Sequence, residues 1–145
     1  MALTVKKVTL WRKEASHAPG VLADVLEPLA EAGVNLRVVM GYAFAGEPSR
    51  GAIEVFPIAG KKAAQAAGEA GLSASPIACV HVEGEDRAGL GAQMARAIAD
   101  KGINISFVTA ETVGRKFSAV FGFQSDGDAV IAARVIKSAA KPKKR

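Results

Sequence analysis

The sequence predicts an α+β protein built from two ferredoxin-like units, in which antiparallel sheets carry helices on one face. The first observation behind this prediction is an internal repeat: a shift of 69 positions aligns residues 20–39 with residues 89–108 without a gap. The second is the order of strand and helix patterns around each copy. It is β-α-β-β-α in both halves, which is the split β-α-β arrangement.

Each copy of the repeat predicts a helix, a glycine that ends the helix, and a strand. Apolar residues recur at helical spacing in both copies, and Gly33 and Gly102 stand where a helix closes in a left-handed residue. Pro28 falls inside the first helix, where we expect a kink or a solvent-facing break. The identical pairs are Gly20/Gly89, Ala23/Ala92, Ala30/Ala99, Gly33/Gly102, Asn35/Asn104 and Val39/Val108.

The flanking segments complete the two units. Alternating and β-branched patterns predict strands, and alanine-rich segments predict the remaining helices. The expected strands are 5–12, 34–42, 51–58, 77–82, 103–113 and 116–124, and the expected helices are 61–70 and 128–140. Leu72–Ser75 could add a short fourth strand to the first unit, but the second unit has no evident fourth strand. The expected division is residues 1–72, residues 73–140 and a basic tail at 141–145.

Composition argues for a folded cytoplasmic protein. Half of the 145 residues are hydrophobic, the chain has one cysteine, and no apolar run approaches the roughly 18 residues of a membrane span. The formal net charge is +5, but four basic residues lie in the last five positions, and removing them leaves +1. The body of the protein is therefore nearly neutral, which disfavours nucleic-acid binding.

The repeated motif resembles the ACT domain. In the first copy, Ala18-Pro19-Gly20-Val21-Leu22 is followed by Gly33-Val34-Asn35-Leu36. In the second copy, Asp86-Arg87-Ala88-Gly89-Leu90 is followed by Gly102-Ile103-Asn104-Ile105. The chain looks most like small stand-alone bacterial proteins made of two ACT domains. The resemblance implies a regulatory protein that binds an amino acid or similar metabolite, usually at an interface between domains or subunits.

The resemblance also implies where the ligand binds: at the loop between the first strand and first helix of each unit, and at the start of the next strand. A helix N-terminus with free N–H groups suits a carboxylate, and an asparagine amide can hold an amino or carboxylate group. The implied ligand-binding residues are Ser16, His17, Ala18, Gly20, Val21 and Asn35 in the first copy, and Glu85, Asp86, Arg87, Gly89, Leu90 and Asn104 in the second.

No pattern in the sequence predicts catalysis. His17 and His81 are far apart, and neither accompanies a patterned nucleophile or metal-ligand cluster. Cys79 lies in an apolar expected strand, and we predict that it is a small core residue. We therefore expect no enzyme activity, no metal and no cofactor. The expected partners are a small molecule, a second copy in a homodimer and an unidentified protein, with no membrane.

An RNA-binding module is the alternative, because the RNA-recognition motif shares this strand order and stacks bases on strand aromatics. With a period of two, Phe117, Phe121 and Phe123 share one face of their strand. The opposing interpretation is that this face lies under the helices and forms core. The near-neutral body favours the core interpretation.

Overall fold

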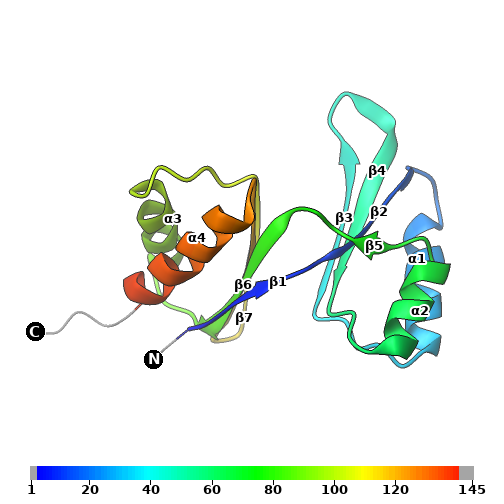
Figure 1. Ribbon diagram of the computed structural model, residues 1–145, viewed down its shortest axis with the longest axis horizontal. Helices are drawn as coiled ribbons and strands as arrows, with labels where there is room; N and C mark the ends of the chain where they lie inside the picture. The colour runs from blue at the N-terminus through cyan, green and yellow to red at the C-terminus, as the bar shows by residue number, and fades with distance from the viewer. Residues whose placement is uncertain (1–2, 141–145) are drawn as a thin grey trace, which may run out of the picture. The chain divides into compact units, whose positions relative to one another are not determined.

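The computed structural model describes residues 3–140, and these form two compact units. The N-terminal unit spans Thr9–Pro76. The C-terminal unit joins the described residues up to Val8 with those from Ile77 onward. The N-terminal unit contains β2 (Trp11–Ser16), α1 (Val21–Glu31), β3 (Val38–Phe44), β4 (Glu47–Phe56), α2 (Lys61–Glu69) and β5 (Ser73–Ala74). The C-terminal unit contains β1 (Thr4–Val8), β6 (Ala78–Glu85), α3 (Leu90–Ala99), β7 (Phe107–Val113), β8 (Lys116–Phe123) and α4 (Asp126–Ala139) (Figure 1).

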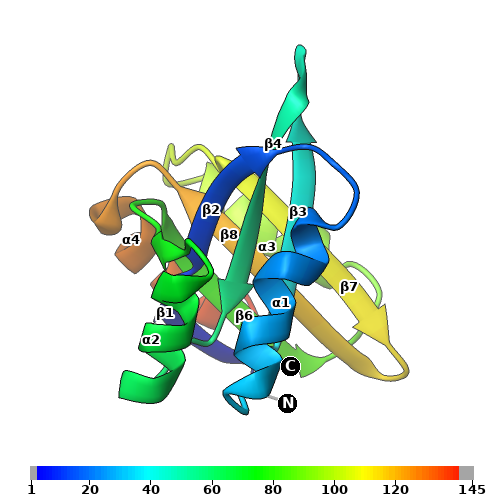
Figure 2. The same cartoon turned by 90° about the vertical axis from the view of Figure 1, so that its right-hand side faces the viewer.

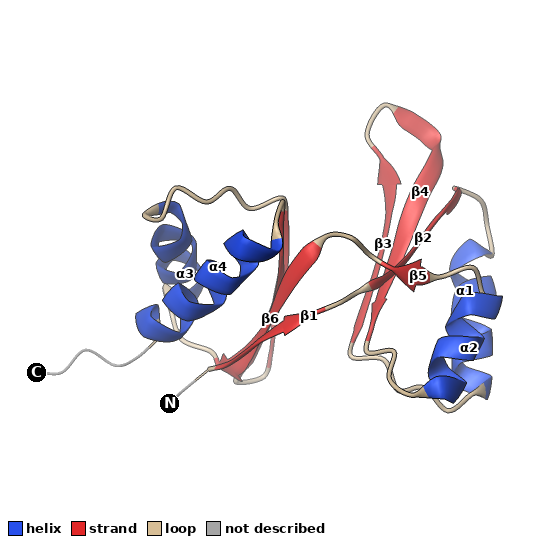
Figure 3. Ribbon diagram, viewed as in Figure 1, coloured by secondary structure: helices blue, strands red, loops and turns tan. Residues whose placement is uncertain are grey.

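The sheet of the N-terminal unit has the strand order β3-β4-β2-β5, with antiparallel neighbours throughout. Because β4 lies between β2 and β3, the β2-α1-β3 connection is a split β-α-β unit. Helices α1 and α2 lie side by side on one face of this sheet (Figures 2 and 3). The buried core between helices and sheet consists of Val25, Leu29, Ile53, Val55, Ala66, Ala67, Ala70 and Leu72.

The sheet of the C-terminal unit has the corresponding order β1-β6-β8-β7. Its fourth strand is β1, which comes from the start of the chain and pairs antiparallel with β6 from Thr4↔Glu83 to Val8↔Cys79. Val5 is 6% exposed and packs in the same core as Val80 and Val82. The strand that was missing from the end of the repeat is therefore supplied at the other end of the sequence.

This arrangement corrects two expectations. The single strand expected over residues 5–12 is two strands, β1 and β2, which belong to different sheets. The expected first domain, residues 1–72, therefore differs from the compact N-terminal unit, because β1 completes the other sheet. The sequence pattern does not reveal that β1 and β2 belong to different sheets, because both strands show the same side-chain alternation and only their long-range pairing separates them.

The α+β fold with two ferredoxin-like units is confirmed, although some boundaries move. Strands β3 and β7 begin at Val38 and Phe107 rather than at 34 and 103, because the residues after each glycine stop first form a loop. Gly33 and Gly102 have φ values of +78° and +71°, as the repeat predicted. Helix α1 continues through Pro28 to Glu31 without the break that was one of the two expectations, and the kink stays a prediction.

The helices differ in how they begin. Ser125 caps α4 by accepting a hydrogen bond from the Asp128 backbone N–H at 3.1 Å. Helices α1 and α3 instead begin at Gly20 and Gly89, both left-handed, and neither N-cap carries a side-chain hydrogen bond. The N-cap glycines therefore provide no side-chain acceptor for the first turn, and the first N–H of each helix donates to a backbone carbonyl: Val21 to Ala18 and Leu90 to Arg87.

Among the described residues, no helix is long and apolar enough to cross a membrane. The basic tail expected at 141–145 lies outside the described residues.

Candidate ligand-binding site

A pocket of about 350 Å³ opens in the N-terminal unit. It lies between the β2–α1 loop, the first turn of α1 and the neighbouring strands β3 and β4. Its volume is within the range of small-molecule sites in proteins. Its lining consists of Ala15, Ser16, His17, Ala18, Gly20, Val21, Leu22, Gly41, Tyr42, Ala43, Gly51, Ala52 and Ile53.

The loop above the pocket is held by backbone bonds. The His17 N–H donates to the Ser49 carbonyl at 2.7 Å, which fixes the loop against the β3–β4 hairpin. Gly20 turns the chain into α1 with φ of +90°, a conformation that residues with a side chain rarely adopt. The uncapped first turn of α1 therefore borders the pocket, and its N–H groups and dipole favour an anion there.

Small residues of the sheet keep the pocket open below the loop. Ala15 pairs with Gly51 across β2 and β4. A Cβ atom at Gly51 would lie 2.4 Å from the Tyr42 carbonyl oxygen, so this position accommodates only glycine unless β3 moves. The pairing between β3 and β4 shifts register at Ala43/Phe44, beside this close approach.

The C-terminal unit has a different residue at the position of Gly51. In the N-terminal unit, Gly51 is the pairing partner of Ala15. In the C-terminal unit the residue that corresponds to Ala15 is Gly84, and its pairing partner is Phe117. Phe117 is 8% exposed and belongs to the hydrophobic core. Leu3 also covers this point, since its Cδ2 atom lies 2.3 Å from where a Cβ of Gly84 would be. Bulky side chains therefore occupy the region that small residues leave open in the N-terminal unit.

The structure brings together five of the six residues predicted in the first copy. Ser16, His17, Ala18, Gly20 and Val21 all line the pocket. Asn35 does not line it: it is exposed in the loop after α1. An 11-residue helix separates this loop from the pocket, a length of roughly 16 Å at 1.5 Å per residue. Within one unit, Asn35 and the β2–α1 loop therefore lie at opposite ends of α1.

The residues predicted in the second copy surround the start of α3. Asp86 and Arg87 lie in the exposed β6–α3 loop, and the Asp86 N–H donates to the Arg115 carbonyl at 2.8 Å, as His17 does to Ser49. The Arg87 guanidinium donates to Gln93 at 2.5 Å. Leu90 is 2% exposed and is a core residue. Glu85 and Gly89 are exposed beside the loop, and Asn104 is exposed beyond the far end of α3.

The sequence argument missed the contribution of β3 and β4 to the pocket. Gly41, Tyr42, Ala43 and the segment 51–53 belong to no motif, and only strand register places them beside the β2–α1 loop. One local signal was available: Gly41 lies inside the strand expected over 34–42, and a glycine inside a strand often marks a site where a ligand or another backbone approaches closely.

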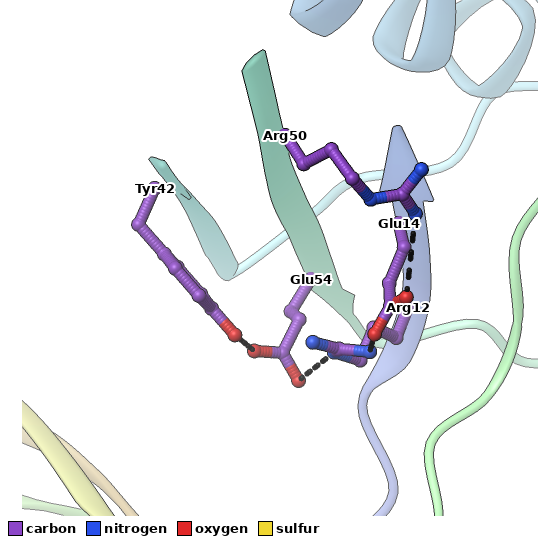
Figure 4. Close-up of polar contacts among 5 residues, drawn as sticks. All are labelled: Arg12, Glu14, Tyr42, Arg50 and Glu54. Atoms are coloured by element: carbon purple, nitrogen blue, oxygen red, sulfur yellow. Dashed lines mark hydrogen bonds and ion pairs between the residues drawn. The ribbon is translucent and has the colours of Figure 1, made fainter. Parts of the chain in front are cut away.

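A cluster of charged side chains lies on the other face of the same strands (Figure 4). Its centre is Glu54, which has no exposed surface and accepts a hydrogen bond from the Tyr42 hydroxyl at 2.9 Å. The Arg12 Nε lies 3.9 Å from the Glu54 Oε1, and the Arg12 Nη1 donates to the Glu14 Oε1 at 2.6 Å. Arg50 adds an ion pair to Glu14 at 3.6 Å.

These contacts alter the acidities of the cluster. Burial raises the pKa of Tyr42, and the neighbouring Glu54 raises it further against the opposing effect of Arg12. The hydrogen bond from Arg12 lowers the pKa of Glu14. The cluster therefore brings two arginines and two glutamates together on one face of the sheet, so that opposite charges lie beside each other.

The remaining sequence candidates lie in the C-terminal unit. Phe117, Phe121 and Phe123 are 8%, 4% and 1% exposed in the core of the C-terminal unit, so they offer no face for stacking RNA bases. His81 is 7% exposed, with its Nε2 3.4 Å from the Ser118 Oγ and 3.5 Å from Glu83. Residues 3–140 contain no group of three or more His, Cys, Asp or Glu side chains that could hold a metal.

Comparison with solved structures reveals the same fold over nearly the whole chain. A protein from Bacteroides thetaiotaomicron superposes with a TM-score of 0.73 at 15% identity, covering 90% of this chain and 88% of the other. The ligand-free regulatory subunit of aspartate kinase from Thermus thermophilus gives a TM-score of 0.63 at 22% identity, covering 97% and 99%. Its counterpart from Thermus flavus gives 0.58 at 23% identity, covering 97% and 98%.

These neighbours support an ACT-like fold. No protein-family model matches the sequence, and no curated protein matches it either.

Proposed function

We propose that this chain is a non-catalytic regulatory protein that binds an amino acid in the pocket of its N-terminal unit. The observation that carries the proposal is the position of the pocket at the uncapped N-terminus of α1. The first-turn N–H groups can receive the α-carboxylate of the ligand, and Gly20 leaves them accessible. The similarity to regulatory subunits of aspartate kinase agrees with such a role.

The two units are unequal in this proposal, and each chain binds one ligand molecule. Gly51 leaves room below the β2–α1 loop, whereas Phe117 holds the matching position in the C-terminal unit. The residues predicted in the second copy then stabilise their loop without contacting a ligand.

Isothermal titration calorimetry against the twenty amino acids tests the proposal. We expect saturable binding of one molecule per chain for a subset of them. Ala43→Trp should abolish binding because it adds a large side chain to the pocket wall, and Thr112→Trp, at the matching exposed position of β7, should leave it unchanged. Binding of no amino acid, or equal loss in both variants, would refute the proposal.

We further propose that a second copy closes the pocket at the β3 edge. Strand β3 is the outer strand of its sheet, and Val39 on it is 45% exposed. Unpaired strand edges favour strand addition. Antiparallel pairing of two β3 strands about Gly41 would place Val38, at the start of one strand, opposite Phe44, at the end of the other, and Asn35 lies three positions before Val38. The exposed Asn35 could then reach the partner's site.

Sedimentation velocity tests this arrangement. Val39→Lys should convert dimer to monomer by placing a charge at the paired edge, whereas Val108→Lys, its counterpart on β7, should not. A dimer that survives Val39→Lys, or a wild-type monomer with bound ligand, would exclude pairing at β3.

A further inference from the structure

The residues that line the pocket indicate which kind of ligand side chain fits there. Among residues 3–140, no aspartate, glutamate, lysine or arginine lines the pocket. Its polar residues are Ser16, His17 and Tyr42; His17 lies exposed on the loop, and the Tyr42 hydroxyl donates to Glu54 on the helix-free side. The helix side of the sheet contributes Ala15, Gly51 and Ile53, which are small or aliphatic.

Strand alternation explains why the nearby charges stay out of the pocket. Ala15, Gly51 and Ile53 alternate along β2 and β4 with Glu14, Arg50 and Glu54, and successive side chains of a strand point to opposite faces. The charged set is engaged on the helix-free side: Glu14 with Arg12 and Arg50, and Glu54 with Tyr42 and Arg12 (Figure 4). On α1 the nearest acid, Asp24, is exposed and does not line the pocket.

We infer that the site selects an α-amino acid with an uncharged side chain of aliphatic size, such as valine, isoleucine or threonine. The inference rests on the proposed function and names the ligand class for that same pocket. The α-ammonium and α-carboxylate are common to all amino acids and do not discriminate among them. A side-chain ammonium, guanidinium or second carboxylate is a further charge, which would lose hydration in the pocket without an opposite charge to compensate it, and burial of an unpaired charge is costly. An aliphatic side chain instead gains by contact with Val21 and Ile53.

Titration calorimetry on the full chain tests the inference, with valine, isoleucine and threonine compared against lysine, arginine, aspartate and glutamate. We expect at least one uncharged ligand to bind about a hundred-fold more tightly than any charged one. If a charged amino acid binds as tightly, and Ala43→Trp abolishes its binding, the proposed function stands and this inference fails. If no amino acid binds, the proposed function fails and the inference fails with it.

A charge placed in the wall provides a second test. Ala43→Asp puts a carboxylate at an exposed position of the lining, where folding should be retained. We expect the affinity for lysine relative to valine to rise about ten-fold or more, because the ligand's ammonium gains a partner. Thr112→Asp, the matched change on β7, should leave this ratio unchanged. An unchanged ratio in Ala43→Asp would overturn the inference.

Discussion

Tyr42 connects the polar cluster to the strand that lines the pocket. Its hydroxyl donates to Glu54 on the helix-free side, while its carbonyl oxygen crowds Gly51 on the neighbouring strand. It is also the single tyrosine of the chain. Its ionisation can therefore be followed without interference from any other residue of its type.

We expect the native protein to release the Tyr42 proton at a pH above the ordinary tyrosine pKa of about 10. Burial raises this pKa, and the ionised phenol would also face Glu54. Because the folded-state pKa is raised, the associated stability is present below the unfolded pKa and is lost as pH rises through the folded one. Tyrosinate absorbance measured against pH checks this, with the denatured protein as reference. Coincident native and denatured midpoints would contradict it.

At this scale the sequence was informative wherever a residue's role is local. The left-handed glycines after α1 and α3 follow from their place at a helix end, and five of the motif residues at the β2–α1 connection line the pocket, while their contact with a ligand stays a prediction. Asn35 is the exception. The motif associates it with the loop, but the length of α1 separates them within one unit. Glu54 gave no signal, because its burial depends on pairing between distant strands.

The β3–β4 pair shows how an element can depend on one missing side chain. Gly51 permits the close approach of the Tyr42 carbonyl at the register shift, and the pocket floor forms at the same point. Gly68 offers a contrast. It lies exposed within α2, and a Cβ there would meet nothing within 4 Å.

We expect Gly51→Ala to destabilise the N-terminal unit by about 1–3 kcal/mol, because the added methyl group forces β3 away from β4. Gly68→Ala should stabilise it by up to about 1 kcal/mol through helix propensity. Urea denaturation followed by Trp11 fluorescence measures both, since Trp11 is the single tryptophan and packs against this unit's core. Equal stability of Gly51→Ala and wild type would show that β3 yields without cost.

Elements with their own periodicity were predictable, whereas their assignment to sheets was not. The helices follow from local apolar spacing, and so does the order of strands around each of them. The break between β1 and β2 falls at Thr9 and Leu10, and no glycine or proline marks it. Leu10 is fully buried, so hydrophobicity continues through the junction and conceals the change of sheet.

At the scale of the whole molecule, the N-terminal unit is inserted into the C-terminal one. The chain leaves β1, completes residues 9–76, and returns at Ile77 to form β6 beside β1. All four strands of the N-terminal unit are contiguous in sequence. The C-terminal unit is instead assembled from two segments, and its pairing between β1 and β6 must close a loop that contains an entire folded unit.

This difference predicts unequal behaviour of the two segments in isolation. Residues 9–76 contain every strand of their sheet and should fold cooperatively, although a unit of this size is marginal. Residues 77–145 lack β1, so the edge of β6 and the core around Val80 and Val82 lose the cover of Val5. We expect this fragment to show weak or absent cooperative thermal unfolding by circular dichroism.

A synthetic peptide of residues 1–8 should restore cooperative unfolding to the 77–145 fragment by adding the missing strand, in the manner of strand addition to an open sheet edge. The same peptide with Val5→Asp should fail, because a charge would enter the core position that Val5 fills. Independent folding of 77–145 without peptide, or equal rescue by both peptides, would mean that β1 is dispensable. The C-terminal unit would then be stable without the strand that precedes the N-terminal unit in the sequence.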